Sequence, residues 1–152
     1  MEHLKIAFFC WESLYAERVG GLANAATNLA ETLAQHHEVH FFTRGWKRDD
    51  EINGVQYHYC RPEGENIIQY CSDMSRGMFD RFREFDTPSF DVLHFHDWHV
   101  VDVLRRLRER ETIFTYHSTE FGRNGNRFSN SWPFVEITRI EHCGASFAKR
   151  IT

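Results

Sequence analysis

Short apolar runs alternate with amphipathic stretches along the whole chain. The first run, His3 to Cys10, is almost continuously apolar, which is typical of a parallel strand buried on both faces. From Leu22 to near His37 the apolar residues recur at helical spacing, and Val39 to Thr43 then predicts a second strand. Asn53-Gly54 indicates a turn. It precedes a third strand, Val55 to Tyr59, whose alternation with polar residues predicts one wetter face.

The second half of the chain continues this alternation. The predicted elements are a helix from Ile67 to Phe82, a strand from Asp91 to Phe95, a helix from Val100 to Leu107, a strand from Thr112 to Tyr116, a polar loop from His117 to Ser131 and a helix from Phe134 to Lys149. Strands that alternate with helices imply βαβ crossovers. We therefore predict an α/β fold, a parallel Rossmann-like sheet with helices on both faces. Residues 1–152 are expected to form one domain, and a further strand starting at Ile151-Thr152 suggests a truncated piece of a longer protein.

Composition and charge exclude several classes of protein. The 152 residues carry a net charge of −4 with both signs interspersed, so no basic face for nucleic acid is expected. No apolar run approaches the roughly 20 residues of a transmembrane segment, and the first residues lack the features of a signal peptide. The four cysteines form no C-x-x-C pair. This favours reduced, mostly buried thiols and a cytoplasmic location.

Ligands of open α/β sheets bind beyond the carboxyl ends of the strands, where the strand order reverses, and this rule selects three segments. The first contains Arg18 and the pair Gly20-Gly21, directly before the first helix. Because glycine has no side chain, a ligand can approach the backbone closely at these positions. The N-terminus of a helix favours an anion, and the side chain of Arg18 could bind a phosphate. The alternative is a tight turn beside a solvated arginine. No G-x-G-x-x-G pattern supports a dinucleotide site.

The second segment is the run His94-Phe95-His96-Asp97-Trp98-His99, the densest titratable cluster in the sequence. On a strand, His94 and His96 point to one face. A zinc or iron site of a metal-dependent hydrolase is one alternative, although the order differs from the H-x-H-x-D-H pattern of such enzymes. We expect His94 to be a hydrogen-bonded core histidine, and His96 to be functional because it ends the strand.

The third segment begins at His117, just beyond a strand, and continues through Ser118, Thr119 and a flexible polar loop. A histidine followed by hydroxyl groups suits recognition of a hydroxyl-rich ligand. An ordinary surface loop is an equally good interpretation of these residues alone.

Together these segments resemble the N-terminal domain of the retaining glycosyltransferases that include glycogen synthase, starch synthase and sucrose synthase. The resemblance rests on KIAFFCWES with Arg-Val-Gly-Gly-Leu, on DVLHFHDWH, on IFTYHS and on the helix leading into AKRIT, in that order. It runs from near residue 4 to the end of the chain. It implies the N-terminal, acceptor-side half of a two-domain GT-B fold, whose C-terminal nucleotide-sugar domain is absent from this sequence.

The resemblance also implies roles for individual residues. Gly20 and Gly21 would lie against the phosphates of the donor, and Arg18 stands where the family usually has a lysine. His96 would be catalytic, beside the transferred sugar, with Asp97 and His117 as substrate-binding residues. Two departures affect this assignment. Arginine in place of lysine keeps the charge but replaces a single ammonium group by a planar guanidinium with several donors. Ser118 replaces the asparagine of the family motif, which changes the expected acceptor-side contact.

The implied activity is transfer of a sugar, with glucosyl expected, from a nucleoside diphosphate-sugar such as ADP- or UDP-glucose to a glycan or other hydroxyl acceptor. The family acts with retention and commonly without a metal, so neither a cofactor nor a metal is expected. Because the main nucleotide contacts lie in the absent domain, residues 1–152 alone are expected to be almost inactive. A metal-dependent hydrolase and a non-catalytic sugar- or nucleotide-binding module are the alternatives.

Overall fold

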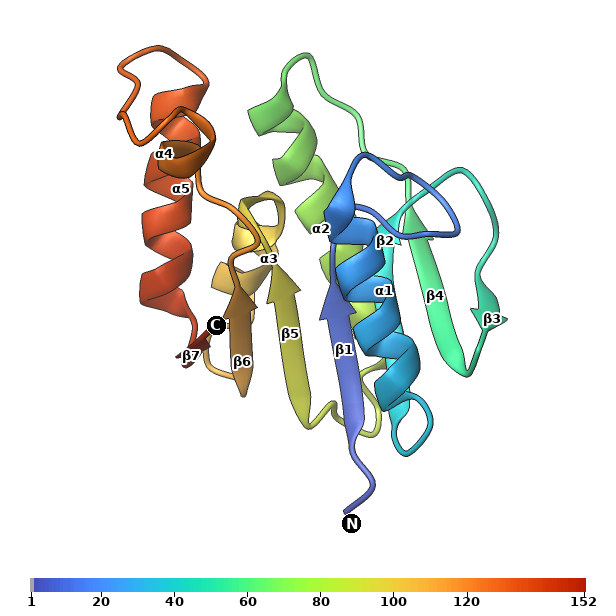
Figure 1. The fold of residues 1–152 in the computed structure, drawn as a ribbon. Helices are drawn as coiled ribbons and strands as arrows, with labels where there is room; N and C mark the ends of the chain where they lie inside the picture. Colours follow the sequence, from blue (N-terminus) through green and yellow to red (C-terminus); the bar gives the residue numbers. More distant parts are fainter. Residues whose placement is uncertain (1) are drawn as a thin grey trace.

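The computed structural model describes residues 2–152, which form a seven-stranded sheet with helices packed on both faces (Figure 1). The strands follow the order β3-β4-β2-β1-β5-β6-β7, and every neighbouring pair is parallel except β3 and β4. The strands are β1 (Lys5–Phe9), β2 (Glu38–Arg44), β3 (Asp50–Ile52), β4 (Val55–Cys60), β5 (Val92–His96), β6 (Thr112–Thr115) and β7 (Arg150–Ile151). The helices are α1 (Gly21–Leu33), α2 (Ile67–Phe85), α3 (Val101–Arg106), α4 (Glu120–Arg123) and α5 (Phe134–Phe147), and a short 3-10 turn (Trp98–Val100) precedes α3.

Two hydrophobic cores lie on opposite faces of the sheet. Phe8 on β1 and Phe41 on β2 point to the face that α1 covers, where Ala26 and Ala30 pack against them. Phe9 and Phe95 belong to the other face, where α2, α3 and α5 supply the packing. Side chains alternate between the two faces of a strand, so a strand buried on both faces is almost continuously apolar. The five residues of β1 are all buried, and the one charged residue among them, Lys5, donates its Nζ to the Pro88 carbonyl at 2.7 Å.

Close packing against α5 depends on a glycine. A Cβ atom at Gly144 would lie 2.4 Å from Cε1 of Phe114 on β6 and 2.9 Å from Cγ2 of Val101 on α3. Helix and sheet therefore approach each other at a distance that no larger residue permits. This contact packs the last turn of α5 against β6 and α3.

Most predicted elements are confirmed, with three differences. The short edge strand β3 lies between the predicted strands Val39–Thr43 and Val55–Tyr59, where no strand was predicted, and runs antiparallel to β4. The predicted wetter face of β4 is wrong, because α2 covers it and His58 there is 4% exposed. The four-residue helix α4 lies inside the predicted loop His117–Ser131 and begins at a Thr119 cap, whose side chain accepts the N–H of Gly122.

The cysteines Cys10, Cys60 and Cys71 are buried, and all four cysteines are free, as predicted. Burial raises the pKa of the Cys10, Cys60 and Cys71 thiols to about 12, so these side chains stay protonated. The cytoplasmic location inferred from them remains a prediction. Among residues 2–152, no helix is both long enough and apolar enough to cross a membrane.

The topology fixes where a ligand can bind. From β1 the chain moves to β2 on one side by way of α1, and it later returns through α2 to β5 on the other side of β1. The strand order therefore reverses between β1 and β5. This is the position at which open α/β sheets bind ligands, beyond the carboxyl ends of the strands.

Candidate functional site

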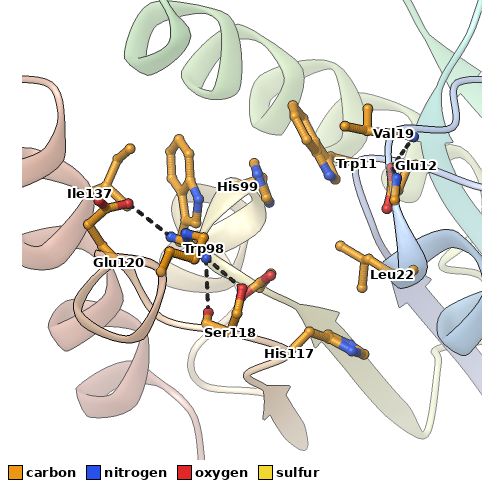
Figure 2. A pocket seen from close by; sticks show the side chains of 14 residues that line it. Trp11, Glu12, Val19, Leu22, Trp98, His99, His117, Ser118, Glu120 and Ile137 are labelled. Atoms are coloured by element: carbon orange, nitrogen blue, oxygen red, sulfur yellow. Dashed lines mark hydrogen bonds and ion pairs between the residues drawn. The ribbon is translucent and has the colours of Figure 1, made fainter. Parts of the chain in front are cut away.

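A pocket of about 660 Å³ lies at this reversal point. Figure 2 shows Trp11, Glu12 and Leu22 on one side of it and Ser118, Glu120 and Ile137 on the other. The pocket is lined by Trp11, Glu12, Val19, Gly20, Gly21, Leu22, Asp97, Trp98, His99, His117, Ser118, Glu120, Arg123 and Ile137. All three sequence segments predicted to bind a ligand therefore meet around one space.

Glu12 occupies the N-terminal end of α1. Its carboxylate is 1% exposed and accepts the backbone N–H groups of Val19, of Gly20 at 3.2 Å and of Ala23 at 3.0 Å. The first N–H groups of a helix lack partners within the helix, and the helix dipole favours an anion there. Because the protein's own carboxylate fills this position, an anionic ligand group beside Gly20 and Gly21 would have to lie further out, on the pocket side of the loop.

The two glycines and Arg18 differ in how they face the pocket. Gly20 and Gly21 line it, and a Cβ atom placed at either would have no heavy atom within 4 Å. Packing inside the protein therefore does not require glycine at these positions, and the missing side chains leave the pocket open. Arg18 is exposed and does not line the pocket.

Asp97 lines the pocket in an uncommon backbone conformation. Its φ of 65° and ψ of 175° lie in a region that is populated almost only by glycine, so the residue is held there under strain. The side chain is buried, and its Oδ1 atom has no hydrogen-bond partner among the described residues. Burial raises the pKa of Asp97 to about 6, against the opposing charge of Arg123. A buried, unpaired carboxyl oxygen at a pocket wall is suited to accept a ligand hydroxyl.

His99 lies between two aromatic rings. Its imidazole stacks on Trp11 with ring centroids 3.8 Å apart and on Trp98 at 4.4 Å, and all three residues line the pocket. Burial lowers the pKa of His99 well below its usual value, so the ring is neutral at pH 7. Its buried Nδ1 atom has no partner among the described residues.

His96 ends β5, as predicted, but its side chain lies behind the pocket wall. Its ring is 1% exposed and does not line the pocket, whereas His117 does. The two rings are joined by a hydrogen bond of 3.0 Å between His96 Nδ1 and His117 Nε2. His94 points to the same face, and its Nε2 shares the predicted hydrogen bond, 2.7 Å long, with the Thr115 hydroxyl. The ring is only partly buried, so the prediction that it belongs to the core is not met.

Both terminal amino groups of Arg123 on α4 are bound by the protein's own groups. Its Nη1 donates to the Ser118 carbonyl at 3.2 Å and to the Ser118 hydroxyl at 2.7 Å. Its Nη2 donates to Glu120 at 3.3 Å and to Glu141 at 3.1 Å. The buried Glu141 carboxylate also accepts the backbone N–H of Glu120 at 2.9 Å, which anchors α4 to α5. Arg123 is therefore a structural cation rather than a free anion receptor.

The hypothesis of a metal centre depended on the histidines and aspartate of residues 94–99. The structure separates these side chains. His94 and His96 stack near Phe8 on the α1 face of the sheet, whereas Asp97 and His99 line the pocket. Within residues 2–152, no group of three or more His, Cys, Asp or Glu side chains is arranged to hold a metal ion.

Sequence reasoning missed several residues of the site. Glu12 gave no signal, because its partners on α1 follow it by as many as eleven residues and meet it only after folding. His99 belonged to the titratable cluster, but its stacking on Trp11 is a tertiary contact. Arg123 and Glu120 stood in the polar loop and could not be told from solvated side chains.

The chemistry of the pocket suits an uncharged, hydroxyl-rich ligand. The carboxylates of Glu12, Asp97 and Glu120 outnumber the one arginine, which is already bound, so among the described residues the pocket lining does not offer a free cation for an anion. Carboxylates and neutral imidazoles hydrogen-bond to hydroxyl groups. Indole rings such as that of Trp98 pack against the apolar faces of a ring-shaped ligand.

Comparisons with known proteins agree with this assignment. The family described as Glycosyltransferase Family 4 matches residues 19–146. No curated protein matches the chain in sequence. Among solved structures, a sucrose-phosphate synthase from Thermosynechococcus elongatus superimposes with a TM-score of 0.76 at 17% identity, over 98% of this chain and 42% of that one.

Two further solved structures share the fold. The catalytic domain of starch synthase IV from Arabidopsis thaliana, bound to ADP and acarbose, gives a TM-score of 0.64 at 16% identity over 77% of this chain and 34% of that one. An α,α-trehalose 6-phosphate synthase from Burkholderia multivorans gives 0.55 at 12% identity, over 97% and 37%. Identities this low show the fold alone. The chain spans 34–42% of the length of these three proteins.

Proposed function

The chain belongs to Glycosyltransferase Family 4, and on this premise we propose that it forms the acceptor-side part of an enzyme that transfers a sugar from a nucleotide-activated donor to a hydroxyl acceptor. One observation carries the proposal. At the reversal point of the sheet, the open Gly20-Gly21 loop at the start of α1 faces Asp97 and His117 across a single pocket. The pocket supplies groups for sugar hydroxyls on one side and an open backbone for the donor on the other.

The finer proposal is a glucosyl donor such as ADP- or UDP-glucose and transfer with retention of configuration. It is supported by the resemblance of the sequence motifs to glycogen and starch synthases. The starch synthase IV structure that shares the fold is named as bound to ADP and acarbose, a nucleotide and a carbohydrate. The acceptor is proposed to be a glycan or another hydroxyl compound.

We propose that a second domain supplies the positive charge for the leaving diphosphate. Catalysis of such a transfer depends on electrostatic stabilisation of the charge that develops on the leaving group. Arg123 is held by Ser118, Glu120 and Glu141, and Arg18 lies outside the pocket, so the lining of this chain is poorly suited to that task. The proposal also agrees with the chain spanning 34–42% of the length of the similar structures.

Within the pocket, His117 and Asp97 are proposed to bind the transferred sugar, and His96 to serve the reacting centre through His117. The support is geometric. His117 lines the pocket, and its Nε2 is held by His96 Nδ1 at 3.0 Å. Since burial lowers the pKa of both rings, both are neutral at pH 7 and act as hydrogen-bonding groups rather than as cations.

The test is a transfer assay with the intact gene product that contains residues 1–152. A panel of labelled ADP-, UDP- and GDP-sugars is incubated with mono- and oligosaccharide acceptors, and glycoside and nucleoside diphosphate are quantified together. The proposal expects equimolar formation of both, with the anomeric configuration of the donor kept in the product. Release of sugar by hydrolysis alone, or no reaction with any donor, would overturn it.

A further inference from the structure

A second cavity adjoins the pocket at the loop between α4 and α5. It has a volume of about 460 Å³ and is lined by Glu120, Arg123, Asn124, Ser129, Ser131 and Phe134. Glu120 and Arg123 also line the first pocket, so the two spaces share this ion pair of α4 in their walls. Both volumes fall in the range of about 300–1,000 Å³ that is usual for small-ligand sites.

Exposed apolar side chains concentrate at the same loop. Of the eight large hydrophobic residues that are exposed within residues 2–152, four lie between positions 128 and 135. They are Phe128 (67%), Trp132 (57%), Phe134 (45%) and Val135 (43%). Phe134 lines the cavity, and Trp132 stands in the sequence between the lining residues Ser131 and Phe134. Exposed apolar residues that cluster beside a hollow indicate a binding surface.

The polar side chains that line this second cavity indicate which kind of ligand it binds. Both amino groups of Arg123 are bound to Ser118, Glu120 and Glu141. The other polar groups that line the cavity are the Glu120 carboxylate, the Asn124 amide and the hydroxyls of Ser129 and Ser131. This combination favours an uncharged ligand with hydroxyl groups over a phosphate or another anion.

We propose that this cavity is a carbohydrate subsite, which binds the part of the acceptor glycan that extends beyond the main pocket. The proposal rests on the proposed function and adds to it a substrate class, an acceptor of two or more sugar units. A sugar ring has an apolar face and a rim of hydroxyl groups. Phe134 matches the face, whereas Ser129, Ser131 and Glu120 match the rim. The shared ion pair Glu120–Arg123 then lies at the junction between two neighbouring sugar units.

The subsite predicts that affinity increases with the length of the glycan. We would titrate residues 1–152, labelled with ¹⁵N, with glucose, maltose and maltotriose and with the β-linked series cellobiose and cellotriose. The backbone amide signals of Asn124, Ser129 and Ser131 are expected to shift with a di- or trisaccharide of one series, and little with glucose. The affinity of that trisaccharide is expected to exceed that of glucose by about tenfold.

Two variants test the cavity, and a third is the matched control. Phe134→Ala and Ser131→Ala change side chains that line it, and Phe134→Ala is expected to weaken trisaccharide binding about three- to tenfold, the scale of one aromatic contact. Affinity for glucose is expected to stay unchanged. Trp46→Ala removes a more exposed aromatic residue (72%, against 45% for Phe134) from the loop between β2 and β3, and it is expected to leave both affinities unchanged.

Equal affinity for glucose and for every longer glycan would overturn the subsite, and so would loss of binding in Trp46→Ala rather than in Phe134→Ala. Binding of phosphatidylcholine vesicles through residues 128–135, without a shift by any oligosaccharide, would assign the surface to a membrane instead and would also overturn it. These outcomes are independent of the transfer assay. If the enzyme transfers sugar to a monosaccharide but its affinity does not depend on glycan length, the proposed function is supported and the subsite is overturned.

Discussion

His96 Nδ1 and His117 Nε2 lie 3.0 Å apart and share one hydrogen bond, so one ring fixes the protonation of the other. The Nε2 atom of His96 is buried without a partner among the described residues. An N–H group left there would lose a hydrogen bond completely, whereas a bare ring nitrogen costs less. We infer that His96 carries its proton on Nδ1 and donates it to His117. His117 then keeps its own proton on Nδ1, where it can serve as a donor.

This arrangement predicts different consequences for the three neighbouring histidines in the intact enzyme. His117→Ala is expected to lower turnover by about 10²–10³, the usual cost of losing a donor that acts in the transition state. His96→Ala, which removes only the support of that donor, is expected to cost roughly tenfold. His94→Ala loses its bond to Thr115 and is expected to lower thermal stability while retaining turnover. Steady-state kinetics and thermal unfolding of the three variants check this order, and a larger loss in His96→Ala than in His117→Ala would show that His96 itself contacts the sugar.

Asp97 predicts a dependence of stability on pH. Burial raises its pKa from the ordinary value of 3.8 to about 6, so the folded state binds a proton that the unfolded state has already released between these values. The contribution of Asp97 to the free energy of unfolding therefore falls as the pH rises from about 4 to about 6. Asp97→Asn removes this penalty and is expected to be more stable than the wild type by about 1–3 kcal/mol at pH 7.5. The difference is expected to vanish below pH 4.

Urea unfolding of both proteins at pH 4.0, 5.0, 6.0 and 7.5 measures this difference. Asp97→Asn is also expected to lose affinity for the sugar, because the carboxylate is the stronger acceptor. A stability gain that is largest at pH 4.0 would contradict the assigned pKa.

Glu12 is predicted to hold the start of α1 in place. In Glu12→Gln an amide group faces the N–H groups that now bond to a carboxylate, so at least one of these buried donors loses its acceptor. The expected loss is about 1–3 kcal/mol of unfolding free energy. Glu17→Gln, an exposed position in the same loop, is the matched control and is expected to change stability by less than about 0.5 kcal/mol. Equal stability of the two variants in urea would refute the role of Glu12.

Gly144→Ala tests the contact between α5 and the sheet. The added Cβ atom would lie 2.4 Å from the Phe114 ring and 2.9 Å from Val101, so these residues have to move. Overpacking of this kind costs typically about 1–3 kcal/mol. Gly122→Ala on α4, where the nearest atom is 3.4 Å away, is the control with ordinary contact. Thermal unfolding should show a clear drop in the midpoint for Gly144→Ala only.

The periodicity of apolar residues was sufficient for the architecture, because each strand and helix buries its own characteristic pattern. Periodicity gave the wrong prediction where a side chain is buried by an element that is distant in the sequence. His58 looked like the polar half of an alternating strand, but α2 covers it, and its ring bonds to His40 at 2.8 Å and to Asp49 at 2.7 Å. The strand β3 is three residues long and acidic, too short for any period to be seen.

The candidate site was predictable in position but not in detail. The rule for open α/β sheets identified the loops of Gly20, Asp97 and His117, which the structure brings together. Which histidine lines the pocket depends on how side chains pack behind it, and periodicity carries no information on that. Glu12 is the clearest case, since a carboxylate before a loop becomes a helix cap only after α1 has docked.

The position of the pocket is tested most directly by filling it without disturbing the fold. Gly20 and Gly21 line it and have open space where a side chain would begin, so Gly20→Leu and Gly21→Leu are expected to unfold within about 1 kcal/mol of the wild type. In the intact enzyme, transfer of sugar from the nucleotide donor should fall by at least about 10²-fold in one or both variants. If both variants are folded and transfer sugar at the wild-type rate, the reaction takes place elsewhere and the account of this pocket is wrong.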